Sequence, residues 1–200
     1  GTLYRFHEAL KHDATLDRIA TINACAKTEQ AHLGLSDAAF LPFALIWPKT
    51  REAYLAWLAG HEASGSVYTA GEVKKEFPLE LVGKTVKLVG TIDRMDLAHA
   101  QGQPVRWLFD YKTESADKTR QRIKQADEDT QLAFYAALVM NDAGVADIES
   151  TVQAAYINLV ERSNGAHTTQ TYALQDVESR RDALLDGIWS DLSRMAAGHG

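Results

Sequence analysis

The sequence predicts an α/β fold, in which a central β-sheet is flanked by helices and preceded by a helical region. Two observations support this prediction. Residues 1–62 carry apolar side chains at helical spacing, whereas residues 63–200 combine short strand-like runs with longer helical stretches. Two hundred residues without an internal repeat or a linker suit one domain. We therefore expect a single domain with a helical part over 1–62 and a sheet-containing core over 63–200. Its abrupt start inside a helical pattern suggests a fragment of a longer chain.

Composition narrows the possible class of protein. With 46% hydrophobic and 24% charged residues, the chain matches an ordinary soluble globular protein. The sequence contains no run of 18 apolar residues, so it predicts no membrane-spanning helix. Cys25 is the sole cysteine, which rules out an internal disulfide or an iron–sulfur cluster held by several thiolates, and suits the reducing cytoplasm expected here. The formal charge of -6 argues against non-specific nucleic-acid binding, although local patches matter more.

The helical region should contain several amphipathic helices. Leu3, Phe6 and Leu10 recur at helical spacing near the start of the chain. Ser36 could cap a short helix that ends at Pro42. A separate helix is expected from Arg51 to Leu58, preceded by Thr50 and closed by Gly60.

Strands are expected next, after a small and polar loop over 63–71. Residues 72–81 alternate weakly, and a hairpin turn at 82–84 leads to a buried strand over 86–96. A loop over 98–104 should join that strand to its partner over 107–113.

The rest of the chain should add two helices around a second hairpin. One long helical stretch is expected from Asp117 to about Asn141. Strands over 151–160 and 167–174 should be joined by an Asn164-Gly165 turn. A helix over about 175–196, capped near Asp176, should close the chain.

Two of the expected strands carry charged side chains at their ends. The period of two in a strand places Asp110 and Lys112 on one face, and Tyr111 on the other. Asp93 ends the preceding strand, so two carboxylates and an ammonium can converge at one edge of the sheet. Paired carboxylates repel each other unless a divalent cation lies between them, and hard oxygen ligands select Mg²⁺ or Mn²⁺. The alternative is a surface salt bridge between Asp110 and Lys112, with Asp93 in a turn.

Three successive segments resemble the motifs of the PD-(D/E)XK nucleases, and most closely those of RecB/AddB-like exonuclease domains. The segments are Gly90-Thr91-Ile92-Asp93-Arg94-Met95-Asp96, then Asp110-Tyr111-Lys112-Thr113, then Gln131-Leu132-Ala133-Phe134-Tyr135. The resemblance is clear over about residues 70–142. It implies a restriction-endonuclease-like core, with a central mixed β-sheet flanked by helices.

The resemblance also implies roles for individual residues. Asp93 and Asp110 would be metal ligands, together with the backbone carbonyl of Tyr111. Lys112 would orient the attacking water or stabilise the transition state. Gln131 and Tyr135, one helical turn apart, would lie beside the site and position Lys112 or the DNA backbone.

The chain departs from the family pattern in its first helix. Family members usually carry a histidine four residues after a glycine there, and the histidine joins the metal shell. Here Gly1 leads to Arg5, and His7 lies about 200° further around the helix. Beside a metal, Arg5 would be repelled unless it pairs with a carboxylate or binds a phosphate. This departure puts metal affinity in question.

Other charged residues lie close to the two strands that carry the predicted site. Arg94 is expected to form a local ion pair with Asp96. A basic run follows the second strand and fits either phosphate contacts with DNA or a solvated helix start: Lys118, Arg120, Arg122 and Lys124.

The expected function is a Mg²⁺-dependent exodeoxyribonuclease in DNA end processing or recombinational repair, supplied with single strands by a helicase domain or subunit. The first alternative is a degenerate nuclease fold that binds DNA or a helicase partner without cutting. The second is an unrelated α/β protein, in which Asp93 and Asp110 would lie far apart.

Overall fold

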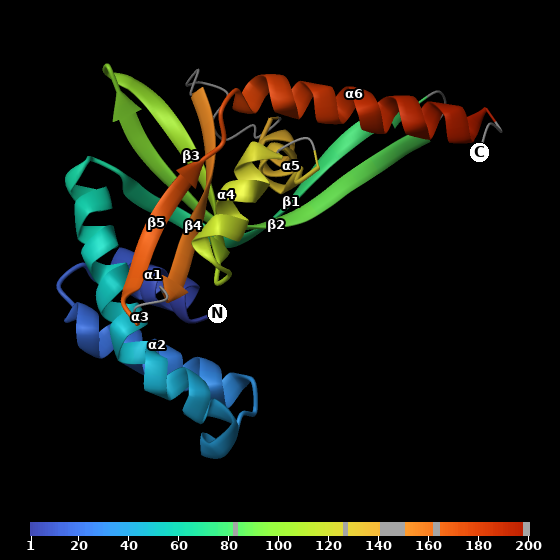
Figure 1. Ribbon diagram of the computed structural model, residues 1–200. Helices are drawn as coiled ribbons and strands as arrows, with labels where there is room; N and C mark the ends of the chain where they lie inside the picture. Colours follow the sequence, from blue (N-terminus) through green and yellow to red (C-terminus); the bar gives the residue numbers. More distant parts are fainter. Residues whose placement is uncertain (82–83, 126–127, 141–150, 162–164, 198–200) are drawn as a thin grey trace.

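The computed structural model describes residues 1–81, 84–125, 128–140, 151–161 and 165–197, and Figure 1 shows how their helices and strands are arranged. In chain order the elements are α1 (Thr2–His12), α2 (Arg18–His32), α3 (Asp37–Ala63), β1 (Val67–Leu81), β2 (Lys84–Ala100), β3 (Gln103–Lys112), α4 (Ala116–Lys124), α5 (Gln131–Leu138), β4 (Thr151–Glu161), β5 (His167–Ala173) and α6 (Val177–Ala196). Among the described residues, no helix has the length and apolarity needed to cross a membrane.

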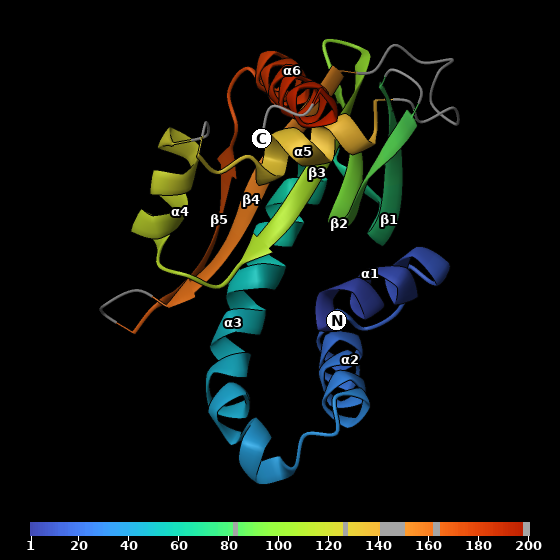
Figure 2. The same cartoon turned by 90° about the vertical axis from the view of Figure 1, so that its right-hand side faces the viewer.

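The five strands form one mixed sheet in the order β1-β2-β3-β4-β5. Neighbouring strands are antiparallel, except that β3 and β4 are parallel. A parallel pair needs a crossover connection, and the segment containing α4 and α5 supplies it (Figure 2). The predicted α/β fold, with a central mixed sheet flanked by helices and preceded by a helical region, is confirmed.

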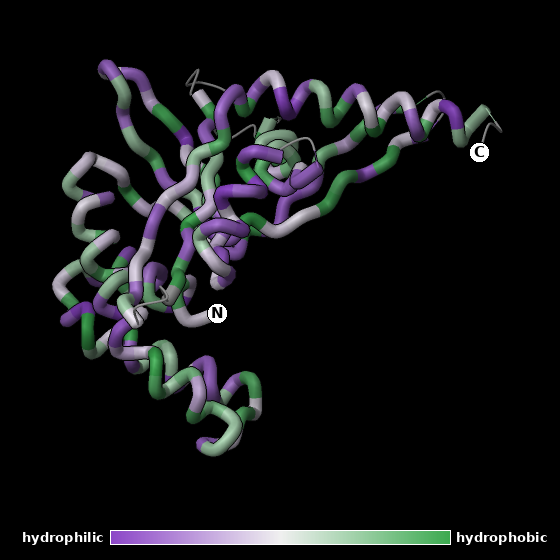
Figure 3. The backbone as a smooth tube through the Cα atoms, viewed as in Figure 1, coloured by the Kyte–Doolittle hydropathy of each residue, from purple (hydrophilic) through white to green (hydrophobic). Residues whose placement is uncertain are grey.

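Two apolar clusters hold helices against opposite faces of the sheet. On one face, α5 packs on Ile92, Leu108 and Tyr156. On the other, α1, α2 and α3 meet around a buried cluster that reaches Tyr111 and Leu159 of the sheet. Figure 3 shows apolar segments in the sheet and α5, and alternating polar and apolar segments along α6. The sheet is therefore covered on both faces near the ends of β3 and β4.

Close packing of α5 on β2 depends on Gly90. A Cβ atom at this position would lie 2.7 Å from Leu138 Cδ1 and 2.9 Å from Phe134 Cε1, closer than real Cβ contacts. Glycine therefore lets the helix that carries Gln131 approach the strand that carries Asp93.

The helical part differs from the expected pattern in one respect. α3 is one helix from Asp37 to Ala63, whereas a short helix ending at Pro42 and a separate helix after Thr50 were expected. Ser36 caps it as predicted, because its side chain accepts a hydrogen bond from the backbone N–H of Ala39. Pro42 and Pro48 lie inside the helix, so burial of Tyr54 and Leu58 outweighs two missing backbone donors.

The second half also differs from prediction at several boundaries. The long helix expected from Asp117 is two helices, α4 and α5, and its predicted end near Asn141 falls outside the described residues. Asp129, between the helices, binds the Tyr156 hydroxyl and Arg122, and this tertiary contact replaces helix continuation. Helix α6 begins directly after Asp176, as expected, but this residue has a φ of 54° and does not cap the helix through its side chain.

The strands are longer, and the loops that connect them shorter, than the sequence suggested. β1 already begins at Val67, inside the expected 63–71 loop. β2 and β3 pair as far as Ala100 and Gln103, which reduces the expected 98–104 loop to Gln101 and Gly102. Both residues have positive φ, as a two-residue hairpin turn requires. The turns predicted at 82–84 and 164–165 include residues outside the described part, while the strands on either side pair antiparallel as expected.

Candidate active site

Asp110 lies near the end of β3, where helix α5 covers the sheet. Its side chain is buried, and Oδ1 accepts hydrogen bonds from Gln131 Nε2 at 2.7 Å and from the Tyr135 hydroxyl at 3.0 Å. Lys112 Nζ lies 2.8 Å from the other oxygen, Oδ2. Four of the predicted site residues therefore come together, two from β3 and two from one face of α5.

The Lys112 ammonium is held from two further directions. It donates a hydrogen bond to Gln131 Oε1 at 2.7 Å and lies 4.9 Å from the centroid of the Tyr156 ring. The Lys112 and Asp110 side chains are only 17% and 6% exposed. The surface salt bridge considered as the alternative is therefore wrong, because this ion pair is mostly buried.

Asp93 lies in the middle of β2, next to β3, and not at the end of its strand as expected, because β2 continues to Ala100. Its Oδ2 accepts a hydrogen bond from the backbone N–H of Tyr111 at 3.1 Å. Burial raises the pKa of Asp93, and the charges of Asp110 and Glu72 raise it further, while the Tyr111 N–H and Lys112 act in the opposite direction. Asp93 thus contacts the residue that follows Asp110 on the adjacent strand, so the structure does not support the alternative in which the two aspartates lie far apart.

The donor atoms here suit a divalent cation. Among the described residues, Asp110 Oδ2 accepts no well-aligned hydrogen bond, although it is buried and has Lys112 as an ion-pair partner. The Lys112 ammonium offsets part of the cost of burying this oxygen, which is left as a ligand for a divalent cation. The described residues contain no group of three His, Cys, Asp or Glu side chains arranged to bind a metal. The side-chain ligands on offer are thus Asp93 and Asp110, and the Tyr111 carbonyl remains a predicted third.

A further carboxylate near Asp93 was missed by the sequence analysis. Glu72 of β1 lines the same cavity as Asp93 and contributes to the raised pKa of that residue. Its φ of 47° is unusual for a residue other than glycine. Gly71 before it is tightly surrounded, because an added Cβ would lie 3.1 Å from the Asp93 carbonyl oxygen. The weak alternation of 72–81 contained no motif that could reveal this contact.

The opposite face of the sheet carries a buried polar cluster. Arg94 donates to both carboxylate oxygens of Asp96, each at 2.8 Å, which confirms the predicted local ion pair. Arg94 Nη1 also donates to the Tyr54 hydroxyl at 2.9 Å, and His61 Nε2 lies 2.8 Å from Asp96 Oδ2. Burial opposes ionisation of Asp96, but His61 and Arg94 outweigh it and keep its pKa below the usual value.

Tyr111 connects this polar cluster with the site. Its hydroxyl lies 3.0 Å from the Tyr54 hydroxyl and accepts a hydrogen bond from Arg94 at 3.4 Å. The residue between Asp110 and Lys112 is thus fixed on one face while its neighbours project from the other.

Neither Arg5 nor His7 replaces the family histidine. His7 is buried in the polar cluster, where Arg94 Nη1 lies 2.7 Å from its Nε2. Burial lowers the pKa of His7, and the charge of Arg94 lowers it further. Arg5 donates to Glu29 Oε2 at 2.9 Å, so it pairs with a carboxylate, one of the two arrangements that would make it tolerable near a metal.

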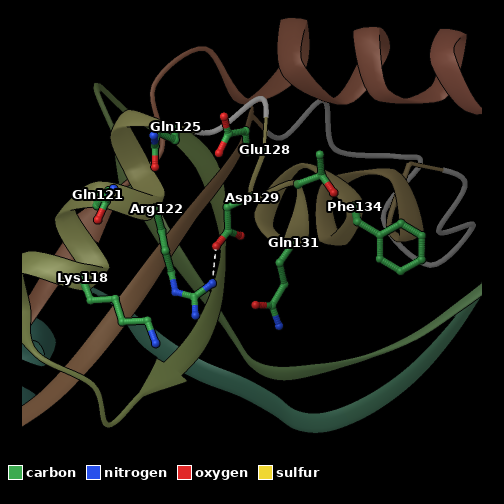
Figure 4. A pocket seen from close by; sticks show the side chains of 9 residues that line it. Lys118, Gln121, Arg122, Gln125, Glu128, Asp129, Gln131 and Phe134 are labelled. Atoms are coloured by element: carbon green, nitrogen blue, oxygen red, sulfur yellow. Dashed lines mark hydrogen bonds and ion pairs between the residues drawn. The ribbon is translucent and has the colours of Figure 1, made fainter.

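The basic run lies on α4, and two of its members, Lys118 and Arg122, line a cavity of about 670 Å³ that Gln131 also lines (Figure 4). Three of its members already face carboxylates. Lys118 lies 3.5 Å from Glu114, Arg122 binds both Glu114 and Asp129, and Arg120 pairs with Asp117. Lys124 is exposed. These pairs fit the solvated helix start, whereas DNA contact by the run stays a prediction.

Comparison with known proteins provides independent information about ancestry. No curated protein sequence matches the chain. A solved structure described as "Crystal structure of SSO0001" is similar over 94% of this chain and 72% of the solved one, at 15% identity and a TM-score of 0.34. The family model described as "PD-(D/E)XK nuclease superfamily" matches residues 2–200. Since that match spans nearly the whole chain, this protein belongs to the PD-(D/E)XK nuclease superfamily.

Proposed function

We propose that this chain is a Mg²⁺- or Mn²⁺-dependent DNA exonuclease that processes DNA ends in recombinational repair. The observation that carries the proposal is the arrangement of Asp93, Asp110 and Lys112 on the adjacent strands β2 and β3, with Lys112 Nζ 2.8 Å from Asp110 Oδ2. Superfamily membership supports a nuclease. The exonuclease mode, a RecB/AddB-like ancestry and a helicase partner rest on motif resemblance alone, and the cytoplasmic location stays a prediction from cysteine usage.

Asp93, Asp110 and the Tyr111 carbonyl would hold the cation. Bound there, a divalent ion would polarise the phosphodiester and lower the pKa of a water molecule. The residues around it restrict the geometry. Gln131 and Tyr135 both donate to Asp110 Oδ1, which fixes the carboxylate plane and directs Oδ2 toward Lys112. Lys112 then supplies positive charge where negative charge accumulates on the phosphate during attack.

The test uses linear single- and double-stranded DNA with Mg²⁺ or Mn²⁺. We expect cleavage that EDTA abolishes and that Asp110→Asn and Lys112→Met each reduce at least about 100-fold, as for loss of a group that stabilises transition-state charge. Lys27→Met, an exposed lysine on α2 outside the predicted DNA-binding run, is the charge-removing control and should cleave within about twofold of wild type. Metal-independent cleavage, or cleavage unaffected by Asp110→Asn, would refute the proposal.

A second candidate function is a degenerate nuclease domain that binds DNA without cutting it. The observation that favours it is Arg5, which stands where the family carries a metal-binding histidine and is paired with Glu29. Calorimetric titration separates the two candidates. Heat of Mn²⁺ binding that disappears in Asp93→Asn supports the nuclease. Salt-dependent DNA binding without such heat supports the degenerate domain.

A further inference from the structure

A cavity of about 650 Å³ opens beside Asp93, and residues of α1, α3 and the three strands β1, β2 and β3 line it. Asp93 and Glu72 line one part of it. Phe43 and Trp47 of α3 form an aromatic wall, and Tyr4 of α1 also lines the cavity. The cavity is thus continuous with the candidate metal site but chemically different from it, because its other wall is largely aromatic.

The aromatic wall is rigid and partly accessible. Phe43 and Trp47 stack on each other, with ring centroids 5.0 Å apart and planes inclined by 28°. The Trp47 indole N–H donates to Asn23 Oδ1 at 2.9 Å, which fixes the orientation of that ring. Both rings are only half-buried, and Phe43 is not a member of any buried apolar cluster. Its ring therefore lines the cavity without an evident packing role in the core.

We propose that this cavity receives the unpaired bases of a single-stranded DNA end, with Phe43 and Trp47 as the surface on which a base stacks. The inference rests on the proposed function, since it assumes that Asp93 helps to hold the reacting phosphate. Aromatic side chains bind single strands by stacking on base faces, which are available only when bases are not stacked in a duplex.

The size of the cavity agrees with this occupant. A volume of about 650 Å³ is typical of a site for one drug-sized molecule, so roughly one or two nucleotides fit and a double helix does not. Charge is consistent as well. The carboxylates of Asp93 and Glu72 would repel a phosphate without a cation, whereas the uncharged rings of α3 would contact bases and not the backbone.

Binding is measured separately from cleavage, by fluorescence anisotropy of a labelled oligo(dT) with Ca²⁺ in place of Mg²⁺, because the cavity carboxylates would repel a phosphate if no cation were present. We expect Phe43→Ala to raise the dissociation constant about fivefold or more, as for loss of one base-stacking ring. Phe43→Leu keeps apolar bulk but lacks a ring face, and should also weaken binding, while Phe43→Tyr should restore it. Leu45→Ala, on the same helix and 71% exposed outside the cavity, is the matched control and should bind like wild type.

The outcomes separate this inference from the proposed nuclease activity. Cleavage with unchanged oligo(dT) affinity and unchanged KM in a folded Phe43→Leu would overturn the stacking surface and leave the nuclease intact. Phe43-dependent binding without any metal-dependent cleavage would refute the nuclease and keep the stacking surface. If the binding of duplex DNA were weakened by Phe43→Ala as strongly as the binding of oligo(dT), the proposed preference for unpaired bases would be wrong.

Discussion

Replacing Arg94 by methionine should destabilise the protein far more than removing an equally short ion pair from the surface. Arg94 is 1% exposed and binds both oxygens of Asp96, whose side chain is fully buried. Methionine would fill much of the space of the arginine stem but leave the carboxylate with His61 as its remaining described partner. Removal of one member of a buried pair costs about 3–5 kcal/mol, because the other charge stays desolvated.

The matched control is Lys87→Met. Lys87 Nζ lies 2.9 Å from Glu76 Oε2, but the two side chains are 64% and 47% exposed. Water compensates for such a loss, so we expect less than about 1 kcal/mol. Domains typically have about 5–15 kcal/mol of stability, so the two variants should be easy to distinguish.

Urea denaturation measures the difference directly, through the midpoint at an unchanged m-value. In thermal melts, Arg94→Met should lower Tm by about 6–20 °C for a chain of this size. Arg94→Met combined with Asp96→Leu removes both charges and should recover much of the loss. If Arg94→Met proved within about 1 kcal/mol of Lys87→Met, burial would not be what makes this pair important.

Four further predictions concern the site. In the metal-free protein, Asp93→Asn should raise the free energy of unfolding at neutral pH. Because the pKa of Asp93 is raised in the folded protein, this carboxyl lowers the stability as the pH rises from about 4 through that pKa. The stability gained by Asp93→Asn in unfolding titrations should therefore vanish below about pH 4. A gain that persists below that pH would contradict the charge argument. Gln131→Leu should reduce cleavage about tenfold or more at a temperature where the variant is still folded, because Lys112 loses the acceptor that orients it, and equal rates would count against that role. Tyr135→Phe should cost about 1 kcal/mol in urea unfolding through the lost hydrogen bond to Asp110, whereas no change would mean that the bond adds nothing. Gly90→Ala should cost about 1–3 kcal/mol, since α5 must move away from β2, and a neutral result would show that α5 adjusts freely.

The sequence predicted which strands and helices carry the site more accurately than it predicted where those elements begin and end. Alternation along β3 correctly separated Asp110 and Lys112 from Tyr111, because the strand period is insensitive to where the strand ends. The α3 helix was misjudged at Pro42, since local helix-breaking preferences were outweighed by burial of Tyr54 and Leu58.

Contacts between distant segments could not be predicted from spacing. Nothing near Glu72 indicates that β1 brings it next to Asp93, because that approach depends on how the strands pair. The sequence likewise did not predict which carboxylates pair with the basic run on α4. Glu114 precedes α4 and faces Arg122 only once the chain has turned into that helix.

Asp93 and Arg94 are neighbours in the chain but belong to opposite sides of the sheet, one with the acidic pair and the other in the buried polar cluster. A slip of one residue between β2 and β3 would exchange them, placing a guanidinium among the site carboxylates and an unpaired aspartate in the interior. Both misplacements would cost stability, so the buried Arg94 favours the native register between the two strands. Selection on this residue would preserve the reaction geometry even though its side chain never meets the substrate.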